Sequence, residues 1–313
     1  MRKSNWLHSN LQSFESYGIS FLGKILSKQD ADSILRSIKA SRPFDSNLFL
    51  SESEFASNQE FRGVNPRPGR NFLETIASAL DPIDKNARLD GLVSKLLGDE
   101  YYLLDRKVVC GIPEWNMPLW LRSRLDGRAI NNLGAYIKPE YRDITYFYGI
   151  DYHQDLIDWP ERDPNFITLY VYLDDVGVDD APLTLLVGSH HLGATEFPHD
   201  LELSDPTDRI WTYKSSSGEV ECSEKKFMAG AGSAAIWHAC TLHGTTPPKS
   251  TIARISLRYL LTSRQIGNRP NIVDIMNTKL FGSVSQKTTR RDQSSFGEIV
   301  KSGNKLIESV VDK

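Results

Sequence analysis

The stretch ITLYVYLDDV, residues 167–176, decides the fold class of this 313-residue chain. Its β-branched and aromatic residues run without interruption until two aspartates, which is typical of a buried strand followed by a turn. Similar segments, separated by Gly, Pro and Asp, are YYLLDRKVV (101–109), NLGAYI (132–137), ITYFYGIDYH (144–153), LTLLVG (183–188), SAAIWHACTLHG (233–244) and ARISLRYLLT (253–262). Because no helical pattern separates these predicted strands, we expect a mainly β fold, either a barrel or a double-sheet jelly roll.

Helical patterns flank this β-rich region. Residues 17–41 predict a short strand and then a helix that Ser27 caps, with one apolar face made of Ala31, Ile34, Leu35 and Ile38. Residues 88–100 return to helical spacing, and Gly98 is placed to end that helix. The polar stretch 40–75 predicts a long loop with local turns.

These patterns together predict one domain over residues 1–313. We expect a mainly helical N-terminal support (1–100), a jelly-roll core (101–263) with an insertion at the barrel mouth (112–133), and a C-terminal extension (264–313).

The composition argues against two classes of partner. The net charge is −3, with basic and acidic residues interspersed, so no basic surface for nucleic acid or an anionic membrane is predicted. The sequence contains no run of about 18 apolar residues, and the N-terminus lacks a signal-peptide pattern. Three widely spaced cysteines cannot all pair, which favours a reducing compartment. We therefore expect a cytoplasmic protein that binds neither nucleic acid nor a membrane, and its oligomeric state, monomer or homodimer, stays open.

His153 and Asp155, in the segment DYHQDLIDWP (151–160), are candidate metal ligands. On a strand that runs into a loop they point to the same side, with α-carbons about 6 to 7 Å apart. Seven histidines and 40 acidic residues predict roughly one such pair by chance, so the spacing alone proves nothing. Two histidines and one carboxylate on one face are typical of non-haem Fe(II) oxygenases, and a third ligand must therefore come from elsewhere.

The third ligand is chosen among the later histidines. His190, His191 and His199 lie in turn-rich or polar segments. His238 and His243 lie on or beside the late strand, five positions apart, so only one of them can face the site on a continuous strand.

The position of a cation decides between His238 and His243. An acidic cosubstrate at the metal needs a fixed cation at its far end, and Arg binds carboxylates bidentately. Arg254 follows His243 by eleven residues, and a hairpin across the turn GTTPPKST would bring the two into one cavity. Lys249 has the same spacing from His238 but lies inside the predicted turn. We therefore favour His243 as the third ligand and Arg254 as the cation. Arg258 lies on the same strand face as Arg254 and is a weaker candidate for the cation.

The ordered motifs of the chain resemble the phytanoyl-CoA dioxygenase family of Fe(II)- and 2-oxoglutarate-dependent oxygenases. The motifs are HQDL (153–156), LDDV (173–176), VGSHHLG (187–193), GSAAIWHACTLHGTTP (232–247) and RISLRY (254–259). The resemblance implies a double-stranded β-helix, a cupin-like jelly roll. It implies His153, Asp155 and His243 as iron ligands and Arg254 as the partner of the cosubstrate's distal carboxylate. It further suggests the pocket residues Thr245, Gln154, Tyr170 and Lys138.

The same resemblance implies a reaction. Fe(II), 2-oxoglutarate and O₂ would oxidise a C–H bond of a small organic molecule, with release of succinate and CO₂. Halogenating relatives replace the ligand carboxylate with a small residue, whereas this chain keeps Asp155, so hydroxylation or another C–H oxidation is expected. Val187 stands where the family usually has Pro, and residues 112–133 lack a clear counterpart. Two alternatives remain: a catalytically silent jelly roll that binds a ligand, and a cupin-type metal enzyme that does not use 2-oxoglutarate.

Overall fold

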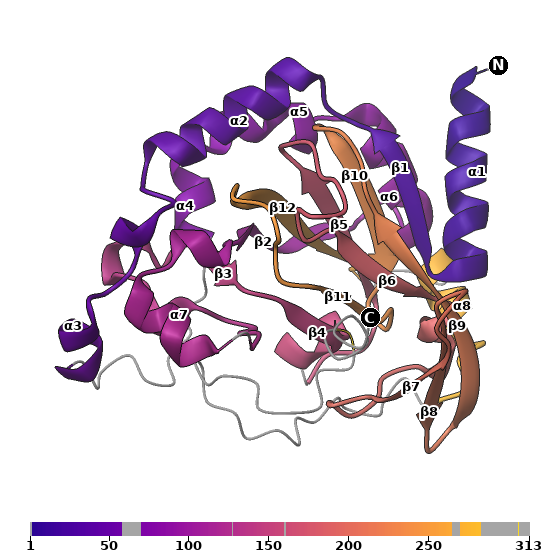
Figure 1. Ribbon diagram of the computed structural model, residues 1–313. Coiled ribbons are helices and arrows are strands. Elements are labelled where there is room, and N and C mark those ends of the chain that lie inside the picture. Colours follow the sequence, from indigo (N-terminus) through magenta and orange to yellow (C-terminus); the bar gives the residue numbers. More distant parts are fainter. Residues whose placement is uncertain are drawn as a thin grey trace.

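The computed structural model describes residues 2–57, 70–126, 128–159, 161–264, 270–282 and 306. Two six-stranded β-sheets form its centre (Figure 1). The first sheet comprises, in spatial order, β1 (Ile19–Lys24), β10 (Ser233–His238), β5 (Phe166–Tyr172), β12 (Arg254–Thr262), β2 (Tyr102–Gly111) and β3 (Thr145–Phe147). The second comprises β4 (Ile150–His153), β11 (His243–Thr245), β6 (Leu183–Val187), β9 (Gly218–Phe227), β8 (Ile210–Ser215) and β7 (Asp200–Asp205).

Successive strands of the core alternate between the two sheets. The chain passes from β4 in the second sheet to β5 in the first and back to β6, and later from β10 in the first to β11 in the second and to β12 in the first. Between the sheets lies an apolar cluster that includes Val109, Phe147 and Tyr170 from the first sheet and Leu185 and Phe227 from the second. The prediction of a mainly β jelly roll with flanking helices is confirmed.

Helices cover the other face of the first sheet (Figure 1). They are α1 (Arg2–Tyr17), α2 (Lys28–Ala40), α3 (Glu52–Ser57), α4 (Arg70–Thr75), α5 (Asp81–Asp84), α6 (Ala87–Leu97), α7 (Leu119–Leu125) and α8 (Ile272–Asn277), and each of them except α3 supplies buried residues to one large core with the sheet. The Ser27 hydroxyl caps α2, and Gly98, with φ +88°, follows the last residue of α6. Both predicted helices are therefore confirmed.

Three predictions of secondary structure are wrong. The segment 132–137 forms a 3₁₀ turn at Gly134–Tyr136 and not a strand. The run 144–153 is split into β3 and β4 at Gly149, whose φ of +78° turns the chain from one sheet to the other. The described part of the stretch 40–75 contains α3 and α4 in addition to turns.

The strands β7, β8 and β9 form a meander that the sequence reading missed. The inward positions are Leu201 and Leu203 on β7 and Trp211 and Tyr213 on β8. The outward positions carry charged residues, so few apolar residues mark these strands in the sequence. The meander extends the second sheet through β9, which pairs with β6 along Leu183–Val187.

Other expectations concern the periphery. The segment 112–133 contains a 3₁₀ turn, Glu114–Asn116, and α7. Most of 264–313 lies outside the described residues, and the described part includes α8. Cys110, Cys222 and Cys240 are all free and buried. Each helix in the described ranges is too short or too polar to cross a bilayer.

Candidate metal centre

His153, Asp155 and His243 converge where two strands of the second sheet end. His153 closes β4, His243 opens β11, and the two residues face each other in the antiparallel register of these strands. Their rings have centroids 4.3 Å apart. Asp155 begins the 3₁₀ turn after β4, and its Oδ2 lies 3.7 Å from His243 Nε2. One ligand atom from each residue lies within 4.8 Å of the others, so a single ion can contact all three.

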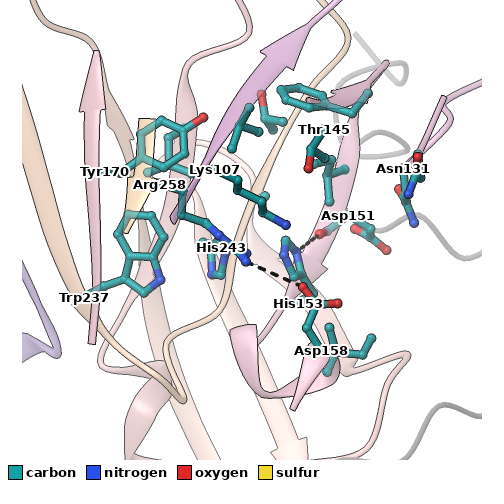
Figure 2. A pocket seen from close by; sticks show the side chains of 18 of the residues that line it. Lys107, Asn131, Thr145, Asp151, His153, Asp158, Tyr170, Trp237, His243 and Arg258 are labelled. Atoms are coloured by element: carbon teal, nitrogen blue, oxygen red, sulfur yellow. Dashed lines mark hydrogen bonds and ion pairs between the residues drawn. The ribbon is translucent and has the colours of Figure 1, made fainter. Parts of the chain in front are cut away.

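The two imidazoles are held with their Nε2 atoms free for a metal. His153 Nδ1 donates to the carbonyl oxygen of Asp151 at 2.9 Å, as Figure 2 shows, and His243 Nδ1 donates to that of Thr241 at 3.1 Å. Such backbone bonds fix the tautomer and the ring orientation of ligand histidines. Burial lowers the pKa of His153 and lowers the pKa of His243 to about 4. Both rings are therefore neutral near pH 7, the form that binds metals.

The Asp155 carboxylate is fully enclosed by hydrogen-bond donors. Oδ2 accepts from the Thr168 hydroxyl at 2.6 Å and from the Trp237 indole at 3.0 Å, and Oδ1 accepts from Arg258 at 2.7 Å. Burial acts to raise the pKa of Asp155, but the attraction of His243, which is protonated at the low pH where this carboxyl titrates, and of Arg258 outweighs it and holds the pKa well below its usual value. The side chain is thus an oriented anion, with lone pairs remaining for a cation.

A pocket of about 150 Å³ opens in front of the two histidines. Its walls come from both sheets: Val109 and Phe147 belong to the first sheet, and Ile150 and Leu183 belong to the second. Two imidazoles and one carboxylate on one side, with open space on the other, is the donor set and geometry that suit a non-haem Fe(II) site.

Arg254, Tyr170 and Thr245 form a polar wall of this pocket. The Arg254 guanidinium is buried, donates to the Tyr170 hydroxyl at 3.0 Å and to the Ala181 carbonyl, and keeps its Nε without a partner. The Thr245 hydroxyl donates to the same Ala181 carbonyl at 2.8 Å. Within the described ranges this buried guanidinium has no carboxylate partner, and with hydroxyls close by it is equipped to bind an anion.

The predicted hairpin between His243 and Arg254 is wrong. β11 belongs to the second sheet and β12 to the first, so the turn after Thr245 carries the chain across the sandwich and not into an adjacent strand. Arg254 therefore faces the histidines from the opposite sheet. The two residues share one cavity because the sheets pack face to face.

Two of the expected pocket residues lie elsewhere. Gln154 is buried but points away from the pocket: its amide donates to the carbonyls of Gly193 and Cys240, and its oxygen accepts from the Thr195 N–H. Lys138 lies at the start of a 3₁₀ turn, where its charge acts on Glu54, and is not among the residues that line the pocket. Gln154 therefore holds two loops together, and Lys138 precedes the 3₁₀ turn Pro139–Tyr141 outside the pocket.

The rejected histidine and lysine are also outside the site. His238 is buried at the end of β10, where its Nε2 bonds to Asn277 at 3.1 Å and its Nδ1 accepts from the Cys240 N–H. Lys249 is exposed in the turn between β11 and β12.

Three residues of the site, Thr168, Trp237 and Lys107, were not predicted from the sequence. Thr168 and Trp237 hold Asp155 and are paired across β5 and β10, and Lys107 is paired with Arg258 across β2 and β12. Arg258 was a weaker candidate for binding the cosubstrate, but it donates to Asp155. Thr168 lies two residues before Tyr170 on the same strand face, and that alternation is the signal that could have found it. The pairing of Lys107 with Arg258 depends on the register between β2 and β12, which no local sequence pattern indicates.

The comparisons with known proteins agree with this geometry. A sequence model of the phytanoyl-CoA dioxygenase (PhyH) family matches residues 35–256. A probable alpha-ketoglutarate-dependent hypophosphite dioxygenase of Stutzerimonas stutzeri is 27% identical over 121 residues, which are 36% of this chain and 38% of that protein. The chain thus aligns with well under half of that relative.

The solved structures extend the likeness of the fold to most of the chain. The non-haem alpha ketoglutarate-dependent epimerase SnoN from nogalamycin biosynthesis has a TM-score of 0.51 at 13% identity, with coverage of 88% of this chain and 89% of that one. Its complex with Fe³⁺, alpha ketoglutarate and nogalamycin RO has a TM-score of 0.52 at 14% identity, with coverage of 88% and 90%.

Proposed function

The chain belongs to the phytanoyl-CoA dioxygenase family of Fe(II)- and 2-oxoglutarate-dependent oxygenases, and from this premise we propose that it hydroxylates a small organic or oxyanion substrate. The observation that carries the proposal is one pocket with three metal-ligand side chains at one side and the buried Arg254 at another. In this proposal His153, Asp155 and His243 bind the iron. When bound, the iron supplies the activation of O₂, and 2-oxoglutarate supplies two electrons as it becomes succinate and CO₂.

The protein's own residues then have four tasks. The three ligands would hold the ion from one side and leave the pocket side open. Arg254, with Thr245 and Tyr170 beside it, binds the distal carboxylate of 2-oxoglutarate, for which the unpartnered Nε is available. Thr168, Trp237 and Arg258 keep Asp155 ionised and oriented. The apolar walls exclude water from the reacting atoms, and the chemistry requires no side chain as general acid or base.

Hydroxylation, as the type of reaction, is a more specific proposal than the use of iron and 2-oxoglutarate. A relative named as a hypophosphite dioxygenase and a structural neighbour named as an epimerase show that this fold and family support different outcomes. Asp155 occupies a ligand position, which leaves no room for a halide in its place. We therefore propose that an oxygen atom of O₂ enters the product, which isotope-labelled O₂ would reveal by mass spectrometry.

Binding of 2-oxoglutarate to the iron-loaded protein tests the proposal directly. Under anaerobic conditions, addition of 2-oxoglutarate to the Fe(II)-loaded chain should produce a weak visible charge-transfer band. Arg254→Met should raise the 2-oxoglutarate concentration for half-saturation by about 10- to 100-fold, because a charged hydrogen-bond pair contributes roughly 1.5–3 kcal/mol. Fe(II) binding should not change, since Arg254 does not contact the three ligands.

Arg36→Met is the matched control, because Arg36 is exposed on α2. It should leave both titrations unchanged. Absence of the band from folded, iron-loaded protein would contradict the proposal and favour a silent jelly roll or a cupin-type metal enzyme. A band with equal 2-oxoglutarate affinity in Arg254→Met would contradict only the role of Arg254.

A further inference from the structure

The pocket contains a second cation that the proposed function does not use. Among the described residues that line the pocket, Arg254, Arg258 and Lys107 carry positive charge. Arg254 is assigned to 2-oxoglutarate, and Arg258 donates to Asp155 at 2.7 Å and lies 3.7 Å from Asp158. The Lys107 side chain takes part in no hydrogen bond or ion pair within the described part of the chain. Its ammonium is attracted by the charges of Asp158, Asp105 and Asp155 but is in direct contact with none of them.

Burial makes this lysine unusual. Lys107 is 9% exposed on β2, and Figure 2 shows its side chain extending into the pocket toward the ligand histidines. Burial is the main cause that lowers the pKa of Lys107 to about 8, and the neighbouring charge of Arg258 adds to it. An unpaired buried ammonium is costly, and apolar residues of similar volume would pack more stably there. A ligand that supplies the missing anion would offset this cost.

Neighbouring polar groups complete a subsite around Lys107. Thr145 on β3 pairs with Val109, two residues along β2 from Lys107 on the same face. Among the described residues, the Thr145 hydroxyl and the Asn131 amide oxygen are both buried and have no hydrogen-bond partner. Because buried polar groups are normally satisfied, the Thr145 hydroxyl is available as a donor to a ligand in the same pocket as the Lys107 ammonium.

The subsite is separate from the end that binds 2-oxoglutarate. On β12, Arg258 is in register with Lys107, whereas Arg254 is in register with Gly111. Four residues along a strand correspond to roughly 13 Å, so the two cations serve different parts of the cavity. The acids at the Lys107 end are already engaged: Asp158 lies near Arg258, and Asp151 accepts from the N–H groups of Tyr152 and Leu306.

Resting on the proposed function, we propose that Lys107 is the substrate anchor and that the substrate is a small anion, a carboxylate or a phosphorus oxyanion. The ammonium pairs with the anionic group and the Thr145 hydroxyl donates to one of its oxygens, while the Asn131 amide oxygen can accept from a donor group of the substrate. The bond to be oxidised is thereby held at the open face of the iron. Selection acts through charge: a neutral molecule of the same shape leaves the ammonium unpaired.

Equilibrium binding of small probes tests the anchor. The protein is loaded with Fe(II) and 2-oxoglutarate without O₂ and titrated calorimetrically with hypophosphite, with isobutyrate, and with isobutyramide as the neutral equivalent of isobutyrate. At least one anion should bind tenfold or more tightly than the amide. Lys107→Met should remove that preference, and Lys107→Arg should retain part of it. Lys225→Met, an exposed lysine on β9, is the control and should bind as wild type does.

The outcomes separate this inference from the proposed function. If neither anion binds more tightly than isobutyramide, or if Lys107→Met binds the anion as wild type does, the anchor is wrong. If Lys107→Met weakens 2-oxoglutarate by the same factor as the anion, Lys107 belongs to the cosubstrate, and the inference is wrong as well. Failure of the wild-type charge-transfer band would instead contradict the proposed function. Preference for hypophosphite or for isobutyrate identifies which class of oxyanion the subsite fits.

Discussion

The environment of Asp155 shows how single side chains prepare a metal site. A carboxylate without solvent contact would normally take up a proton, because burial disfavours its charged form. Three donors on three strands prevent this: Thr168 on β5, Trp237 on β10 and Arg258 on β12. All three strands belong to the first sheet, whereas the two histidines belong to the second. Each sheet thus contributes a different part of the site.

Thr168→Val tests this preparation at the residue scale. The substitution keeps the shape of the side chain but removes the 2.6 Å hydrogen bond to Asp155 Oδ2. Loss of such an outer partner typically weakens metal binding by about 10- to 100-fold, and we expect a decrease of that order in Fe(II) affinity. Competition with a chelator of known affinity measures it.

Thr184→Val is the control for this substitution. Thr184 is equally buried, on β6, and its hydroxyl makes only a long bond of 3.4 Å to the Pro182 carbonyl. Its Fe(II) affinity should stay close to wild type. Equal affinities in all three proteins would show that Thr168 does not support the ligand.

At the scale of elements, the site depends on how closely β4 and β11 approach each other. β11 has only three residues and lies between β4 and β6. A Cβ atom on Gly244 would lie 2.6 Å from the Ile150 carbonyl oxygen and 3.0 Å from the Asp151 carbonyl carbon. These are backbone atoms of β4, so they can give way only if the strand moves. The glycine therefore permits the spacing that brings His153 and His243 together.

Gly244→Ala should separate the two strands. Overpacking of this kind costs about 1–3 kcal/mol, so we expect a loss of that size in the free energy of unfolding, measured by urea denaturation. Fe(II) affinity should fall as well, because the histidine Nε2 atoms move apart.

Gly91→Ala is the matched glycine substitution. Gly91 lies in α6, where an added Cβ meets nothing within 4 Å. Alanine in a helix should increase stability by about 0.5–1 kcal/mol without an effect on metal affinity. A Gly244→Ala protein as stable as Gly91→Ala, with normal Fe(II) binding, would show that the close approach is not required.

For the molecule as a whole, local sequence patterns predicted where strands occur better than they predicted which strands pair with each other. Seven segments were predicted as strands because β-branched and aromatic runs are a local property, and the order of motifs indicated which side chains could meet. The sheet that each strand joins is not local. β11 and β12 follow each other closely in the sequence, yet they belong to different sheets, and this is why the hairpin prediction failed.

The same limit explains which site residues were found. His153, His243 and Arg254 were proposed from spacing and from the need for a cation, and the structure brings them to one pocket. Lys107 was not proposed from the sequence. Its position in the pocket depends on the register of β2 against β12, and these strands are more than a hundred residues apart in the sequence. The meander β7–β9 was missed for a different reason: its strands are exposed on one face, so charged residues dilute the apolar signal.

Buried histidines outside the metal centre predict how the stability of the whole molecule depends on pH. His238 lies between Phe14, His190 and Asn277, and burial lowers its pKa to about 4. The folded state therefore keeps this ring neutral, whereas the unfolded chain binds a proton near pH 6.5. Stability is complete above pH 6.5 and falls as the pH decreases from 6.5 toward 4, by at most about 1.4 kcal/mol per unit for one histidine.

His238→Gln should make the molecule less sensitive to acid. The amide can still hydrogen-bond to Asn277 but cannot take up a proton in the unfolded chain. Urea denaturation of the metal-free protein at pH 7.5, 6 and 5 should show a smaller loss of unfolding free energy in the variant, by up to one proton's contribution. The wild-type loss should exceed that of one histidine, because burial also lowers the pKa of His190 and, to about 3, that of His199. Parallel curves for the two proteins would mean that His238 is protonated without cost in the fold, and the acid sensitivity would then have to come from the remaining buried histidines.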